Sequence, residues 1–251
     1  MVEPLFRFEG QLVSGQTVLL TGTEGHHAAA VRRMRVGEAI ALTDGNGTFG
    51  RGQVTEVQPK QISVKLFSVE IQALEHPLFT LVQAVTKGDR DEMAVQATTE
   101  LGVSRITPWQ SNRSISRWDG KEAKNIARWQ AIADEAAKQS LRVNFPKVGA
   151  VLSTGSLAGC VVDSATSKSV YLVLDPTSTT SITDDAVQAR IAAAIEIAVV
   201  VGPEGGIEEF ELEALEAAGA LRVHVGTSIL RTSTAGVAAF SYLSGALGKW
   251  Q

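Results

Sequence analysis

Two patterns of apolar and polar positions follow one another along the chain. Over about the first 74 residues the apolar stretches are short, and two of them, 52–57 and 61–66, alternate apolar with polar side chains. Such alternation is typical of antiparallel strands with one buried face. Together with strands expected at 16–20 and 38–42 and a short helix at 25–33, it predicts a small β-barrel.

After a candidate linker around residues 73–77, strands alternate with helices. Stretches such as 198–201 are apolar throughout, which is typical of a parallel sheet that helices cover on both faces. Polar stretches at 153–156 and 164–169 are predicted to be loops. The expected strands are 78–85, 105–109, 170–174, 197–201 and 221–225, and the expected helices are 91–101, 121–140, 184–194, 208–218 and 234–247. We therefore expect a barrel domain of residues 1–74 and an α/β domain of residues 75–251.

Composition narrows the class of protein. The chain has 251 residues, 44% of them apolar, which excludes disorder as its main state. No apolar run is long enough to span a bilayer and no secretory signal is visible, so we expect a cytoplasmic protein with no membrane partner. Cys160 is the single cysteine, and the adjacent His26 and His27 would diverge by about 100° on a helix. We therefore expect no disulfide and no metal site.

The charge is unevenly distributed. The net charge is −4, but residues 1–147 carry 18 basic and 16 acidic side chains, whereas residues 148–251 carry 5 and 11. Three arginines, Arg32, Arg33 and Arg35, stand within four positions, and guanidinium groups suit phosphates. This asymmetry indicates either an anion-binding surface in the first part or unevenly solvated faces.

Residues 45–50 match the pattern G-x-G-x-x-G, which in dinucleotide-binding proteins opens a helix. Here an alternating strand follows the glycines instead. The sequence Asp44-Gly45-Asn46-Gly47 is typical of a hairpin turn, so the match is no support for a nucleotide-dependent oxidoreductase.

Two other glycine-bearing loops each follow a predicted strand and precede a predicted helix. The first is Gly202-Pro203-Glu204-Gly205-Gly206. The second runs from Val225 through Arg231 to Gly236, and Thr232, Ser233 or Thr234 could cap the helix that it opens. Ligands of α/β proteins bind at the carboxyl ends of the strands, so we expect the two loops to form one pocket.

These loops resemble the paired C-terminal motifs of the RsmE family, the 16S ribosomal RNA uridine-N3 methyltransferases of the SPOUT superfamily. The resemblance covers nearly the whole chain. Its further motifs are, in chain order, His26-His27 with Val31–Glu38, Lys87–Arg90, Glu100–Val103, Ile106–Pro108 with Ser111 and Arg113, and Glu135, Gln139, Arg142 and Pro146. The chain departs from the family pattern at Ser228, where a basic residue is frequent, and at Ser233, where many members carry glutamate.

The resemblance implies a PUA-like RNA-binding barrel in residues 1–74 and a SPOUT α/β domain with a deep trefoil knot in residues 75–251. It implies a homodimer that binds S-adenosyl-L-methionine and methylates uridine N3 in the decoding region of 16S rRNA, within the small ribosomal subunit. For that reaction we expect Arg231 either to be the catalytic residue, by stabilising negative charge on the base oxygens, or to organise the knot loops. The implied cofactor-binding residues are Leu174, Gly202, Pro203, Glu204, Gly205, Gly206, Val225, Gly226, Ile229, Leu230, Thr232, Thr234 and Ala235. The implied RNA contacts are Arg32, Arg33, Arg35, Lys87, Arg90, Arg113, Lys138 and Arg142.

Two alternatives remain open. A SPOUT methyltransferase that acts on another RNA or on a ribose 2′-hydroxyl would keep the same loops. A non-catalytic RNA-binding protein would keep the arginines without needing the glycine loops.

Overall fold

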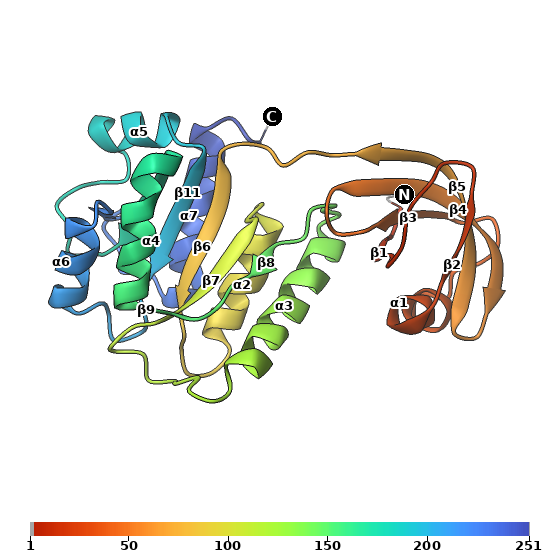
Figure 1. The fold of residues 1–251 in the computed structure, drawn as a ribbon, viewed down its shortest axis with the longest axis horizontal. Coiled ribbons are helices and arrows are strands. Elements are labelled where there is room, and N and C mark those ends of the chain that lie inside the picture. Colours follow the sequence, from red (N-terminus) through yellow and green to blue (C-terminus); the bar gives the residue numbers. More distant parts are fainter. Residues whose placement is uncertain (1–2, 251) are drawn as a thin grey trace. The chain divides into compact units, whose positions relative to one another are not determined.

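In a computed structural model that describes residues 3–250, the chain forms two compact units (Figure 1). The N-terminal unit contains the residues up to Leu74 together with Ala137–Phe145. The C-terminal unit contains Glu75–Ala136 and the residues from Pro146 onward.

The N-terminal unit is built on a five-stranded sheet with the order β1-β3-β4-β5-β2. Its strands are β1 (Leu5–Arg7), β2 (Thr17–Leu20), β3 (Ala39–Thr43), β4 (Thr48–Gln58) and β5 (Gln61–Ile71), and α1 (Gly22–His26) with the π-helical turn η1 (His27–Val31) follows β2. The core contains Phe6, Ile40 and Leu66, each at most 2% exposed. The four predicted strands are confirmed, β1 was not predicted, and the predicted hairpin joins the antiparallel β3 and β4.

The segment Ala137–Phe145 joins this unit although the sequence assigned it to the α/β domain. Its backbone completes the β3–β4 turn, because Gly47 N donates to Val143 O at 3.1 Å and Phe145 N donates to Gly45 O at 2.9 Å. Thr43 Oγ1 also donates to Val143 O. The assignment of 75–251 as one continuous domain is therefore corrected for these nine residues.

The C-terminal unit is a parallel sheet with the strand order β12-β10-β11-β6-β7-β8, to which β9 adds beside β7. The strands are β6 (Leu78–Ala84), β7 (Arg105–Gln110), β8 (Lys147–Val148), β9 (Leu152–Ser153), β10 (Ser169–Leu174), β11 (Glu196–Val201) and β12 (Leu221–Val223). The helices are α2 (Arg90–Glu100), α3 (Glu122–Gln139), α4 (Thr154–Ser167), α5 (Asp185–Ala192), α6 (Glu209–Ala217) and α7 (Thr232–Ala246). The predicted parallel α/β arrangement is confirmed.

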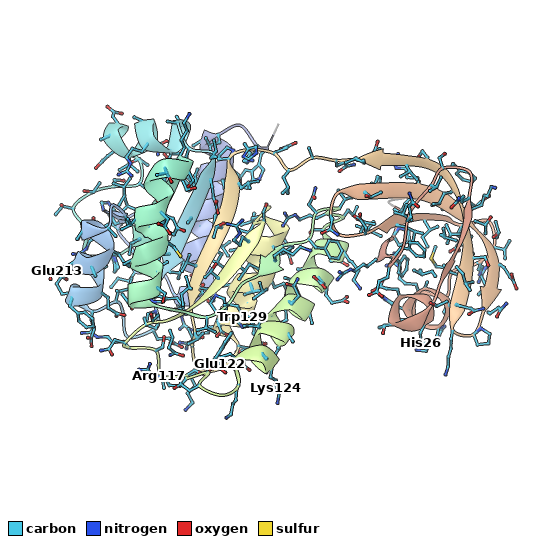
Figure 2. All side chains as sticks on the ribbon, viewed as in Figure 1. His26, Arg117, Glu122, Lys124, Trp129 and Glu213 are labelled. Carbon is cyan, nitrogen blue, oxygen red and sulfur yellow. The ribbon has the colours of Figure 1, made fainter. Side chains whose placement is uncertain are left out.

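Helices cover both faces of this sheet, as the apolar strands predicted. Along β11, Val199 packs in the core cluster that includes residues of α2, α3, α5 and α7, whereas Val200 packs in the cluster of α4 and α6. On the first face lies Trp129 of α3 (Figure 2). Its ring meets that of Trp118 edge-on, with ring centroids 4.9 Å apart. A strand buried on both sides in this way has no room for polar positions, which explains its unbroken apolar sequence.

The loops predicted at 153–156 and 164–169 are wrong, because α4 occupies most of this region. Leu157 and Val161, one turn apart, are buried against the sheet, and this packing holds the helix despite its serines. Ser153 caps its N-terminus by accepting from Ser156 N. Cys160 is half-buried on this helix.

Candidate functional site

The carboxyl ends of β10, β11 and β12 form one edge of the sheet, and a cavity of about 670 Å³ opens there. The strands end level with one another, since Leu174 pairs in register with Val201 on one side and with Val223 on the other. The cavity is lined by Arg90, Arg113, Leu174, Asp175, Pro176, Thr177, Val201, Gly202, Pro203, Glu204, Gly206, Ile207, Glu209, Leu212, Val225, Gly226, Ser228, Ile229, Leu230, Arg231, Thr232 and Ala235. The structure thus brings the two predicted loops together in one pocket.

The loop after β11 makes a tight turn into the pocket. Gly206 N donates to Pro203 O at 2.9 Å, and Gly206 has a φ of +75°, a region that favours glycine. At Gly202 a Cβ would lie 2.6 Å from Ile207 Cγ1, so a side chain there would displace the pocket wall. The glycines therefore set the path of the backbone around the cavity.

Thr232 links the two predicted loops. Its Oγ1 donates to Gly202 O at 2.9 Å and accepts from Gln83 Nε2 at 2.8 Å. The prediction that Thr232, Ser233 or Thr234 caps α7 is wrong. The N-cap position is Arg231, and no side chain makes a capping hydrogen bond there.

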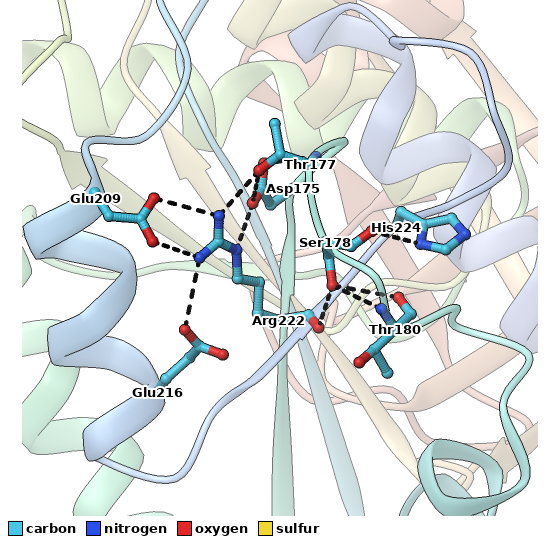
Figure 3. A network of polar contacts seen from close by, with 8 residues as sticks. All are labelled: Asp175, Thr177, Ser178, Thr180, Glu209, Glu216, Arg222 and His224. Atoms are coloured by element: carbon cyan, nitrogen blue, oxygen red, sulfur yellow. Dashed lines mark hydrogen bonds and ion pairs between the residues drawn. The ribbon is translucent and has the colours of Figure 1, made fainter.

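A third loop, Asp175-Pro176-Thr177, forms another wall of the pocket and was not predicted beyond Leu174. The Asp175 carboxylate accepts from Thr177 N and Thr177 Oγ1 and from Arg222 Nε (Figure 3). Burial raises the pKa of Asp175, but these hydrogen bonds outweigh it, so the pKa lies below its ordinary value. This loop could have been predicted from its position directly after a buried strand. Nothing in the sequence around Arg222 indicated that this residue contacts the loop.

Three arginines line the pocket, and two of them are paired with acids. Arg90 Nη1 lies 3.5 Å from Glu204 Oε1. Arg113 donates from Nη1 to Gly205 O at 2.9 Å, and its Nε lies 3.3 Å from Glu208 Oε1.

Arg231 differs from these two arginines. Its side chain is exposed in the pocket wall, and it forms no ion pair with any acid among residues 3–250. Arg231 is therefore the pocket cation that is available to a bound anion.

The remaining predicted residues divide into exposed and buried positions. Of the proposed cofactor contacts, Gly205 and Thr234 are the two that do not line the pocket. Arg32, Arg33, Arg35 and Lys87 are exposed. Lys138, however, is 9% exposed and donates to Glu24 Oε1 at 2.6 Å, while burial lowers the pKa of Arg142 to about 10.

The described part of the chain was searched for clusters of metal-ligating side chains and for membrane-spanning helices. No group of three or more His, Cys, Asp or Glu residues within 3–250 could hold a metal ion. Across the same residues, no helix combines the length and the apolar character that crossing a membrane requires.

Comparisons with known proteins agree with this geometry. Residues 74–244 match the RNA methyltransferase domain family, and residues 20–67 match the RNA methyltransferase PUA domain family. Ribosomal RNA small subunit methyltransferase E of Mycobacterium bovis is 37% identical over all of this chain and 94% of its own length.

Two solved structures are similar throughout, each with a TM-score of 0.85. Ribosomal RNA small subunit methyltransferase E of Neisseria gonorrhoeae, bound to S-adenosyl methionine, is 31% identical, and the match covers 97% of this chain and 98% of that one. A methyltransferase of Legionella pneumophila in complex with the cofactor SAM is 30% identical, with 98% of both chains covered.

Proposed function

The chain belongs to the RsmE family of RNA methyltransferases, and we propose that it transfers a methyl group from S-adenosylmethionine to N3 of a uridine in 16S rRNA. The observation that carries this proposal is the pocket at the sheet edge. Three loops enclose it, it matches the size of small-molecule sites, and it presents the unpaired Arg231.

The residues present fit S-adenosylmethionine. Leu174, Val201 and Val225 give apolar surface for an adenine ring, and the glycine-bearing turn at 202–206 lets backbone groups approach a ligand closely. Each of the three carboxylates that line the pocket has a cationic partner: Glu204 pairs with Arg90, and Asp175 and Glu209 both pair with Arg222. When bound, this cofactor supplies an electrophilic methyl group on a sulfonium.

Arg231 is the proposed catalytic residue. N3 of uridine carries a proton at neutral pH, and its loss leaves a negative charge that spreads onto the two base oxygens. A guanidinium in the pocket wall stabilises that charge as it develops. Because none of the residues that line the pocket is a histidine, we assign proton acceptance to solvent or to an RNA phosphate.

The exposed cations are the proposed phosphate contacts. Arg32, Arg33 and Arg35 of the N-terminal unit and Lys87 of the C-terminal unit present their side chains to solvent. Arg90 and Arg113 contact RNA at the pocket mouth in this proposal. The Lys138 side chain is committed to Glu24, so we assign it a structural role.

Family membership also supports the finer features of the fold. We propose that the five-stranded sheet closes as a PUA-like barrel, that the loops 202–206 and 225–235 belong to a trefoil knot, and that two copies form the active enzyme on the small ribosomal subunit. Sedimentation analysis tests the dimer directly, and a purely monomeric protein at micromolar concentration would contradict it.

The central test joins binding with RNA mapping. Calorimetry should show binding of S-adenosylmethionine, and its absence would favour the non-catalytic alternative. Mass mapping of 16S rRNA from a deletion strain should show one uridine that lacks a base methyl, restored by the wild-type gene. Restoration should fail with Arg231→Ala and succeed with Arg128→Ala, whose arginine pairs with Glu92 on the surface. A 2′-O-methyl at that site would instead favour the ribose alternative.

A further inference from the structure

Arg222 lies behind two walls of the pocket and contacts both of them, although it does not line the cavity itself. It is the middle residue of β12, and its side chain is 18% exposed. Figure 3 shows its guanidinium between the loop after β10 and the first turn of α6.

On one side the guanidinium holds the Asp175–Thr177 loop. Nε donates to Asp175 Oδ2, and Nη2 donates to Thr177 Oγ1 at 2.9 Å. A second link runs through the backbone, because Ser178 Oγ donates to Arg222 O at 2.9 Å. The loop is therefore fastened to β12 through both the side chain and the main chain of one residue.

On the other side the same guanidinium holds α6. Nη1 donates to Glu209 Oε1 at 2.7 Å and Nη2 to Glu209 Oε2 at 3.3 Å, while Glu216 Oε2 lies 3.8 Å from Nη1. The hydrogen bonds that Arg222 donates to the Glu209 carboxylate raise the pKa of Arg222, so its side chain stays charged. Asp175, Thr177 and Glu209 all line the pocket, and Arg222 is the cation that they share.

We propose that Arg222 is a positioning residue for the cofactor: its planar fork fixes the separation of these two pocket walls and thereby sets cofactor affinity. The inference rests on the proposed function, because it takes S-adenosylmethionine as the ligand. A lysine keeps the charge, but its three N–H donors all lie on one nitrogen, so it cannot replace the contacts that Nε, Nη1 and Nη2 of Arg222 make to Asp175, Glu209 and Thr177. Arg222→Lys is therefore the informative substitution.

The experiment is calorimetric titration of S-adenosylmethionine into the full-length protein and its variants. We expect Arg222→Lys to weaken binding about tenfold and Arg222→Met to weaken it further. Arg128→Lys should leave the dissociation constant within about twofold, since its partner Glu92 and the exposed α3 surface lie outside the pocket lining. The melting temperature of each variant is measured before the titration, so that a variant with weaker binding can be distinguished from one that is unfolded.

A double-mutant cycle distinguishes a role of Arg222 in positioning the pocket walls from a general loss of cofactor affinity. Thr177→Val removes the hydroxyl that Arg222 contacts, so its effect on affinity should overlap with that of Arg222→Lys rather than add to it. The effects of Thr177→Val and Arg128→Lys on cofactor affinity should add. Hydrogen exchange at the Thr177 amide, which donates to Asp175 Oδ1, should speed up in Arg222→Lys without any ligand present.

Steady-state kinetics supply the last readout. The KM for the cofactor should rise in Arg222→Lys while the KM for RNA stays within about twofold. An unchanged dissociation constant for the cofactor, or equal losses toward both substrates, would overturn the inference. Failure of the wild-type protein to bind S-adenosylmethionine would instead overturn the proposed function, so the two failures are distinct.

Discussion

Replacing Asp91 with asparagine should remove a pH-dependent loss of stability from the C-terminal unit. Asp91 lies in the first turn of α2 and is 3% exposed. Its carboxylate accepts from Thr86 N at 3.0 Å and from Glu92 N at 2.8 Å. No cation among residues 3–250 pairs with it, and burial raises its pKa to about 6. The carboxylate is therefore charged at pH 7 at a cost to the fold.

The sign and size of the effect follow from linkage. Because the pKa in the folded state is above the unfolded value of about 3.9, the folded protein binds this proton more tightly, and the free energy of unfolding falls as pH rises from about 4 to about 6. A pKa difference of this size corresponds to about 3 kcal/mol above pH 6, at about 1.4 kcal/mol for each tenfold change in proton affinity. Asp91→Asn abolishes this titration. Its stability relative to wild type should thus improve by about 3 kcal/mol between pH 4 and pH 7.

Urea unfolding followed by tryptophan fluorescence measures the stability difference between wild type and Asp91→Asn in the C-terminal unit. All four tryptophans, Trp109, Trp118, Trp129 and Trp250, belong to the C-terminal unit. Other carboxylates titrate in both proteins, so the difference between the curves isolates Asp91. Glu92→Gln, at the neighbouring position, removes a surface ion pair and should shift stability by less than about 1 kcal/mol. A wild-type-to-Asp91→Asn difference that is the same at every pH would refute the reasoning.

Two further substitutions test individual contacts. Thr232→Val removes the hydrogen bond to Gly202 O and should weaken S-adenosylmethionine binding about tenfold, which corresponds to a loss of about 1.4 kcal/mol. Thr232→Ser keeps the hydroxyl and should keep most of the affinity. Equal affinities of the two variants in calorimetry would contradict this prediction. Lys138→Met removes the ion pair with Glu24 and should lower the free energy of unfolding of the N-terminal unit by about 1–3 kcal/mol. The dependence of RNA affinity on salt concentration should stay unchanged. A weaker salt dependence in the variant would show that Lys138 contacts phosphate.

The parts of the fold that the sequence predicted are those with a local signal. β11 is apolar at every position after its first residue because both of its faces are covered, and this distinguishes it from the alternating β4 and β5. The loops at 202–206 and 225–235 were found because glycines directly follow such strands. The hairpin before β4 was found from its Asp-Gly-Asn-Gly turn.

Features that depend on distant partners had no such signal. The strand β1 is three residues long and pairs with β3, more than thirty positions away, so no periodicity can develop in it. The helix α4 was hidden by serines and threonines, several of which bond back to carbonyls of their own helix, as Ser164 does to Val161 O. Arg222 and Asp175 stand 47 positions apart, and only the parallel pairing of β10 with β12 brings them together.

Contacts between residues that are distant in the sequence also hold the pocket in its shape. The loop at 202–206 is rich in glycine, which gives close backbone approach but offers few side chains to hold the loop in place. The anchors of the pocket loops come from outside each loop: Thr232 holds Gly202 O, Arg113 holds Gly205 O and Arg222 holds Asp175. Two of these anchors, Arg113 and Arg222, lie outside the two glycine-bearing loops. Cofactor affinity should therefore be as sensitive to substitutions at Arg113 and Arg222 as to substitutions in the glycine loops themselves.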